Sequence, residues 1–143
     1  MLDNVQTHNN SDNVQFQNAT NPGGYQCDIY AWNEAINHGR DPRGQNGEAP
    51  DLNGISVDTW FDSFPDNRTN LPSSNTQGYI FYDWDNNETQ DHVEFYMAGE
   101  GTDYTVMGTS GIEPPTPREY DSNIDANGRA ATGTATYVPL PEL

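Results

Sequence analysis

The chain has 143 residues, a length that fits a single domain with a small hydrophobic core. It carries 22 acidic residues against five arginines and no lysine, so its formal net charge is −17. A surface this acidic repels the phosphates of nucleic acids and of anionic membranes, so we expect both to be poor partners.

The same composition favours a protein that works in high salt. An excess of acidic residues and a lack of lysine are typical of halophilic proteins, and in 1 M salt the Debye length falls to about 3 Å, which screens the repulsion between like charges. No apolar run approaches the ~20 residues of a membrane span, so we expect no membrane insertion. The stretch MLDNVQTHNN has neither a basic start nor an apolar core, so we expect no signal peptide and a cytoplasmic or virion-associated protein.

The first half of the chain predicts a polar arm followed by two helices. Residues 1–20 are rich in Asn and Gln and show no hydrophobic period, which is typical of an arm. A helix is predicted over 26–38, with Cys27 in its first turn and Gly39 as its stop. The apolar residues that recur there at helical spacing are Ile29, Trp32 and Ile36. A second, short helix is expected over 57–64, where VDTWFDSF would bury its aromatic residues.

The second half predicts an antiparallel meander of strands. Aromatic residues favour a strand at 79–84, and alternating apolar residues favour one at 92–97. A third strand is expected at 104–107. A fourth, at the edge of the sheet, is expected at 132–138, within a Pro/Gly-rich C-terminal extension over 114–143. Helices followed by such a meander predict the α+β class.

Between the first two strands, DWDNNETQDHVEFY at 83–96 gathers acidic and amide side chains around one histidine. Counted from Asp83, these side chains occupy ligand positions 1, 3, 5, 9 and 12 of an EF-hand loop, with Glu94 as the last. Position 6 should be glycine but is Glu88, and strands flank the loop, so we prefer a looser Ca²⁺ site. Its predicted ligands are Asp83, Asp85, Asn87 and Asp91. The alternative is a solvated hairpin in which Asp and Asn serve as turn formers.

Cys27 and His92 are the residues whose types and positions suggest catalysis. The N-terminus of a helix presents about half a positive charge, which favours a thiolate at Cys27, and an imidazole beside it completes a nucleophile–base pair. Strand alternation turns Val93 toward the core and His92 to the other face, where the helix N-terminus could meet it. The alternative is a cysteine that serves as an inert small hydrophobic residue.

The segments GGYQCDIYAWNEAINHG and GYIFYDWDNNETQDHVEFYMAG together resemble the CHAP family within the NlpC/P60 superfamily of cysteine hydrolases. The likeness has three parts: a Gln-Cys pair that opens an aromatic-bearing helix, a strand that ends in an Asp-rich hairpin, and a His-Val pair that opens the next strand. It spans residues 23–112. The resemblance implies a papain-like core over 21–113 that cleaves peptide or amide bonds in cell-envelope substrates and requires no cofactor.

By position, the resemblance makes Cys27 the nucleophile and His92 the general base. It also implies that backbone N–H groups at the start of the helix, together with Gln26, hold the oxyanion. Met107 and Thr109 align with the positions at which the family usually carries Glu and Asn as its third catalytic group, so Thr109, or Ser110 beside it, is expected to orient the imidazole. Glu94, on the same strand face as His92, is the alternative, although positions i and i+2 of a strand lie roughly 6.5–7 Å apart.

Two other functions remain open on the sequence alone. The chain could be a non-enzymatic component of a larger assembly, such as the tail of a halophilic virus, built on a hydrolase fold that has lost its activity. Polar arms that become ordered only against other subunits are what such a component would carry. The chain could also be a calcium-dependent binding module that uses the hairpin at 83–91.

Overall fold

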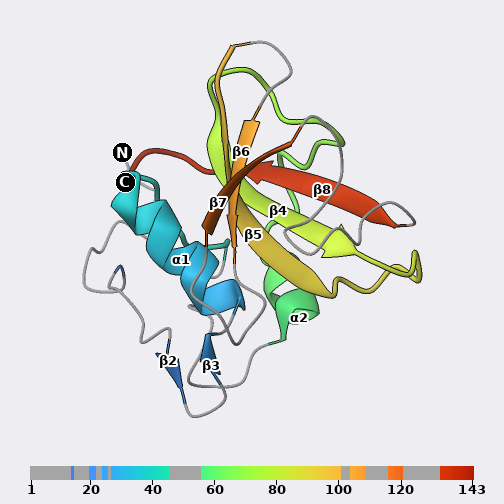
Figure 1. The fold of residues 1–143 in the computed structure, drawn as a ribbon. Helices are drawn as coiled ribbons and strands as arrows, with labels where there is room; N and C mark the ends of the chain where they lie inside the picture. Colours follow the sequence, from blue (N-terminus) through green and yellow to red (C-terminus); the bar gives the residue numbers. More distant parts are fainter. Residues whose placement is uncertain are drawn as a thin grey trace.

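A computed structural model describes residues 14, 20–21, 24–25, 27–45, 56–100, 104–108, 116–120 and 133–143. In this part of the chain, two helices and an antiparallel sheet form an α+β fold (Figure 1). The elements in chain order are β2 (Thr20–Asn21), β3 (Gly24–Tyr25), α1 (Cys27–Asn37), α2 (Val57–Phe61), β4 (Gln77–Asp83), β5 (His92–Ala98), β6 (Tyr104–Gly108), β7 (Thr116–Tyr120) and β8 (Thr134–Pro139).

The main sheet pairs its strands antiparallel in the order β7-β6-β5-β4-β8. β4 and β5 form a hairpin inside this sheet, and its register sets Tyr82 opposite His92 and Ile80 opposite Glu94. β8 comes last in the chain, yet it pairs with β4, and Figure 1 shows the red β8 running alongside the light green β4. The C-terminal strand therefore belongs to the sheet that carries His92.

The helix α1 matches the prediction and begins at Cys27 itself. It ends where Arg40 N donates a hydrogen bond to Ala35 O at 2.8 Å. Gly39 just beyond the helix has a φ of 75°, the left-handed conformation that commonly ends helices. Of the strands in the main sheet, β5 is the one against which α1 mainly packs. The start of the helix and the start of β5 can therefore belong to one site.

The helix α2 begins at a capped residue and ends earlier than expected. The Ser56 side chain accepts a hydrogen bond of 3.0 Å from a backbone N–H of the first turn, which stabilises the helix start. The helix predicted over 57–64 stops at Phe61. Pro65 disfavours the helical conformation at the preceding Phe64, so the chain leaves the helix before reaching it.

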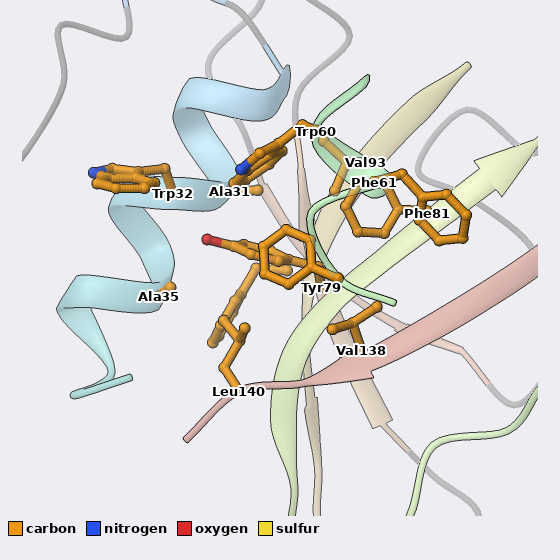
Figure 2. Close-up of a cluster of buried hydrophobic side chains, with 12 residues drawn as sticks. Ala31, Trp32, Ala35, Trp60, Phe61, Tyr79, Phe81, Val93, Val138 and Leu140 are labelled. Atoms are coloured by element: carbon orange, nitrogen blue, oxygen red, sulfur yellow. The ribbon is translucent and has the colours of Figure 1, made fainter. Parts of the chain in front are cut away.

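One hydrophobic cluster lies between the two helices and one face of the sheet. Figure 2 shows the ring of Trp60 from α2 close to Tyr79 of β4, and the two ring centroids lie 4.6 Å apart. Phe81 of β4 and Val93 of β5 are fully buried in the same cluster. The helix α1 contributes Ala31 and Ala35 to this cluster. Because these side chains are small, α1 can approach the sheet closely.

The opposite face of the sheet is buried as well. Successive residues of a strand point to opposite faces, so β4, β5, β6 and β8 supply a second apolar cluster, Ile80, Tyr82, Tyr96, Ala98, Val106, Ala135 and Tyr137. Burial on both faces explains why β4 reads as a nearly continuous hydrophobic run. By the same alternation Glu94 lies on this second face, and it is completely buried.

The strands expected at 79–84, 92–97 and 104–107 are confirmed as β4, β5 and β6, and the strand expected at 132–138 is found as β8. The structure also contains β7 and the short pair formed by β2 and β3, which the sequence did not predict. β7 reads TPREY, and its proline is compatible with a strand because β7 lies at an edge of the sheet.

Most of the arm expected over residues 1–20 lies outside the described residues. Neither helix in the described part of the chain has the length and apolar character that a membrane span needs.

Candidate active site

Cys27 is the first residue of α1, where the backbone N–H groups lack acceptors within the helix. Its side chain is partly buried and packs against the hydrophobic cluster between the helices and the sheet. The following residue, Asp28, is buried, and its carboxylate accepts a hydrogen bond from Ile29 N at 2.8 Å. The helix therefore presents the thiol at the positive end of its dipole.

His92 is the first residue of β5, and Cys27 lies close enough to its imidazole to raise its pKa. Only 4% of His92 is exposed. Its Nε2 atom lies 3.0 Å from Oε2 of Glu94. Because Nε2 is engaged there, the other ring nitrogen, Nδ1, is the one available to the Cys27 sulfur. The fold thus brings together the two residues that the sequence suggested as nucleophile and base.

Glu94 holds the far side of the imidazole. One of its carboxylate oxygens meets His92, and the other, Oε1, accepts a hydrogen bond from the Tyr82 hydroxyl at 3.3 Å. Positions i and i+2 of a strand lie roughly 6.5–7 Å apart, but this spacing describes the backbone. The two long side chains lean toward each other, so their tips meet although their backbone positions do not.

Two aromatic rings stack on the imidazole of His92. The Tyr82 ring lies with its centroid 5.9 Å away and is inclined by 25°, and the Trp84 ring lies 5.3 Å away and is inclined by 22°. Tyr82 is fully buried and Trp84 is half-buried. These rings limit the rotation of the imidazole and reduce the water around it.

The charge state of His92 follows from these neighbours. Burial lowers the pKa of His92, but the hydrogen bonds and negative charges of Cys27 and Glu94 outweigh this effect and raise the pKa from 6.5 to about 10. The imidazole is therefore protonated at neutral pH. With a proton on each ring nitrogen, it can donate to the carboxylate and to the sulfur at once.

The hairpin between β4 and β5 is held together by its own acidic side chains. Asp83 is buried, and its carboxylate oxygens accept hydrogen bonds from the backbone N–H groups of Asn87 at 3.1 Å and Glu88 at 2.7 Å. Asp91 Oδ2 accepts a hydrogen bond from Trp84 N at 2.9 Å. Aspartates therefore stabilise the turn, as expected from the alternative in which Asp and Asn of this segment serve as turn formers.

Three of the four predicted calcium ligands place carboxylate oxygens within 4.8 Å of one another, a set that could hold a cation: Asp83, Asp85 and Asp91. The fourth, Asn87, donates its side-chain amide to Asp85 Oδ2 at 3.3 Å. The EF-hand register is not formed, because Glu94 faces His92 and not the loop. Calcium binding at this hairpin stays a prediction.

Two predicted site residues, Gln26 and Thr109, lie outside the described residues, so their roles stay predictions. Tyr82 and Trp84 contact His92, and the sequence analysis did not assign them to the site. The hairpin register is the signal that could have found them, because a strand pair that sets Tyr82 opposite His92 brings their side chains onto one face.

A cavity of about 220 Å³ opens elsewhere, between residues 43–45, residues 63–67 and residues 138–141, and Cys27 and His92 do not line it.

Comparison of the chain with protein-family models, with curated proteins and with solved structures found no match. The chemistry of this site is therefore inferred from its residues and their geometry.

Proposed function

We propose that the chain is a papain-like cysteine hydrolase of the CHAP type, which cleaves a peptide or amide bond in a cell-envelope substrate. The observation that carries the proposal is the proximity of Cys27, the first residue of α1, to the imidazole of His92, whose pKa it raises. A nucleophile in contact with a base that a third group holds is the arrangement of nucleophilic catalysis. A cysteine-bearing helix packed on an antiparallel sheet also supports a papain-like core.

In the first half of the reaction, the thiolate of Cys27 attacks the carbonyl carbon of the scissile bond. A C–S bond forms, and the carbonyl oxygen takes the negative charge. The backbone N–H groups at the start of α1, with Gln26, donate hydrogen bonds to this oxyanion. His92 then gives its proton to the leaving nitrogen as the C–N bond breaks, which leaves a thioester on Cys27.

In the second half, water releases the acyl group. His92, now neutral, accepts a proton from a water molecule whose oxygen attacks the thioester carbonyl carbon. The C–S bond breaks, the acyl group leaves as a carboxylic acid, and Cys27 returns to the thiolate. His92 is again protonated, so the pair is ready for the next substrate.

A non-enzymatic subunit of a larger assembly, such as a viral tail, is the second candidate function. The observation that favours it is the burial of His92, which restricts the access of a substrate to the pair. In that role the contact between Cys27 and His92 would be a remnant of catalysis, and the thiol would react like an ordinary cysteine.

Alkylation with iodoacetamide at pH 6 separates the two functions. Cys27 is the only cysteine, so the label reports on this site alone. A free cysteine with a pKa of about 8.5 is less than ~1% ionised at pH 6 and reacts slowly. We expect wild-type Cys27 to react at least ~10-fold faster than Cys27 in His92→Ala, because the imidazolium stabilises the thiolate.

His38→Ala is the matched control, because His38 lies just beyond the other end of α1 and stacks on Phe95 at a ring distance of 5.1 Å. This variant should keep the wild-type alkylation rate. Equal, slow labelling of the wild type and His92→Ala would rule out the hydrolase and leave the assembly subunit.

A further inference from the structure

We propose that Glu94 is the positioning residue for His92, and that Tyr82 in turn fixes the Glu94 carboxylate. This inference rests on the proposed function. The site is then completed on one face of the β4–β5 hairpin, by a carboxylate two residues after the histidine on the same strand. Glu94 is the alternative that the sequence offered for this role beside Thr109, which lies outside the described residues.

The geometry places both carboxylate oxygens of Glu94 against groups that can donate a proton. Oε2 lies 3.0 Å from Nε2 of His92, and Oε1 lies 3.3 Å from the Tyr82 hydroxyl. The hairpin register sets Tyr82 directly opposite His92. Glu94 lies two residues further along β5, on the same face of the sheet as His92. A single pair of strands therefore fixes all three side chains relative to one another.

The burial of Glu94 argues that it is there for a reason other than packing. Its exposed fraction is 0%, and it lies on the sheet face that carries Ile80, Tyr96 and Val106. A buried carboxylate is costly unless it is paired and hydrogen-bonded, and an apolar side chain would fill this position more favourably. The ion pair with His92 offsets this cost, and at the same time it holds the imidazole.

The hydrogen bond to Glu94 decides which ring nitrogen meets the thiol. With Nε2 held by the carboxylate, Nδ1 is presented to Cys27, and the ring cannot turn without losing the ion pair. Among the described residues, the titratable groups around the imidazole are the thiol of Cys27 from α1, the Tyr82 phenol from β4 and Glu94 on β5 itself. The stacked ring of Trp84 covers the imidazole and lowers the local dielectric, which strengthens the pair.

The test measures two properties of purified full-length variants at one pH, the alkylation rate of Cys27 and the NMR signal of the His92 ring N–H proton. We expect Glu94→Leu to slow alkylation by about 10–100-fold, the loss typical when a carboxylate that orients a functional histidine is removed. Glu94→Gln should lose less, because its amide oxygen can still accept the hydrogen bond. Tyr82→Phe, which removes only the hydroxyl, should cause the smallest loss.

The NMR signal separates positioning from a general effect on folding. In the wild type, the ring N–H that faces Glu94 should resonate far downfield, as protons in strong hydrogen bonds to carboxylates do. In the isosteric Glu94→Gln it should move upfield, because an uncharged amide is the weaker acceptor. The matched control is Glu34→Gln, since Glu34 lies on α1 with an oxygen 3.8 Å from His38 Nδ1. It should change neither property.

The outcomes distinguish this inference from the proposed function. An unchanged ring N–H signal in Glu94→Gln, or wild-type alkylation in folded Glu94→Leu, overturns the positioning role while the activated thiol stands. If wild-type Cys27 reacts no faster than Cys27 in His92→Ala, the proposed function itself fails, and the positioning role fails with it. If Glu94→Leu does not fold, Glu94→Gln, which keeps the size of the side chain, decides.

Discussion

His92 stands where three elements meet, and each of them restricts a different freedom of its ring. Cys27 at the start of α1 raises the pKa of the imidazole, and Glu94 on β5 lies 3.0 Å from its Nε2 atom. Tyr82 and Trp84, at the end of β4 and just beyond it, stack on the ring. The position, the orientation and the charge of the imidazole therefore all depend on these four neighbouring side chains.

The stability of the fold should depend on pH through His92. The pKa of about 10 in the folded protein lies above 6.5, the ordinary value that applies to the unfolded chain. The imidazolium therefore contributes its full stabilisation below pH 6.5, and this contribution is lost as the pH rises toward 10. We expect the free energy of unfolding, measured by urea denaturation at constant salt, to fall between pH 6.5 and 10.

His92→Gln is the reference for this measurement, because glutamine keeps a hydrogen-bonding side chain that does not titrate. The wild type should lose more stability than His92→Gln over the same pH interval. If the two proteins lost equal amounts, the raised pKa of His92 would be refuted.

At the scale of elements, the predictions that succeeded rest on periodicity. Alternation in HVEFYM was enough to set Val93 toward the helices and His92 and Glu94 on the other face, because the backbone of a strand fixes a period of two. Apolar residues at the helical spacing of about 3.6 predicted α1 in the same way, with Cys27 in its first turn.

What the sequence could not supply depends on contacts between distant segments. The meeting of Glu94 with His92 depends on side-chain rotamers, which strand spacing does not determine. The stacking of Tyr82 and Trp84 depends on the hairpin register. β7 was missed because TPREY lacks the apolar alternation of a half-buried strand, and its place comes from pairing with β6.

The pairing of β4 with β8 depends on a glycine. A Cβ atom at Gly78 would overlap the backbone carbonyl of Val138 on β8. We expect Gly78→Ala to destabilise the fold by about 1–3 kcal/mol, because the two strands must separate to admit the methyl group. Denaturant unfolding gives this difference directly.

Gly99→Ala is the matched control, because a Cβ atom at Gly99 would meet nothing within 4 Å. It should change the free energy of unfolding by less than ~0.5 kcal/mol, as surface substitutions usually do. Equal effects of the two substitutions would mean that β8 does not approach β4 as closely as the structure describes.

At the scale of the whole molecule, charge is the dominant property. The net charge of −17 is spread over a small chain, and repulsion among the carboxylates opposes the compact state at low salt. The candidate site contains the same kind of charge, because Asp83 and Asp91 stabilise the turn that leads into β5. Molar salt screens repulsion of this kind.

The melting temperature should rise as KCl increases from 0.1 to 2 M, because the added ions screen the repulsion between carboxylates. A variant that carries both Asp66→Asn and Glu100→Gln, at two exposed positions, should show a smaller rise, since it has fewer charges to screen. A melting temperature that stayed constant, or fell, over this range would contradict the high-salt adaptation inferred from the composition.

The most direct test of the proposed hydrolase is acylation of Cys27 by a small activated ester, p-nitrophenyl acetate, followed by absorbance and by intact-mass spectrometry. An active nucleophile–base pair should release a burst of about one nitrophenolate per chain and leave one acetyl group on Cys27. Cys27→Ala should give no burst, and His92→Ala should acylate at least ~10-fold more slowly. The absence of a burst from the wild type, or acylation at the same rate in His92→Ala, would contradict catalysis by this pair.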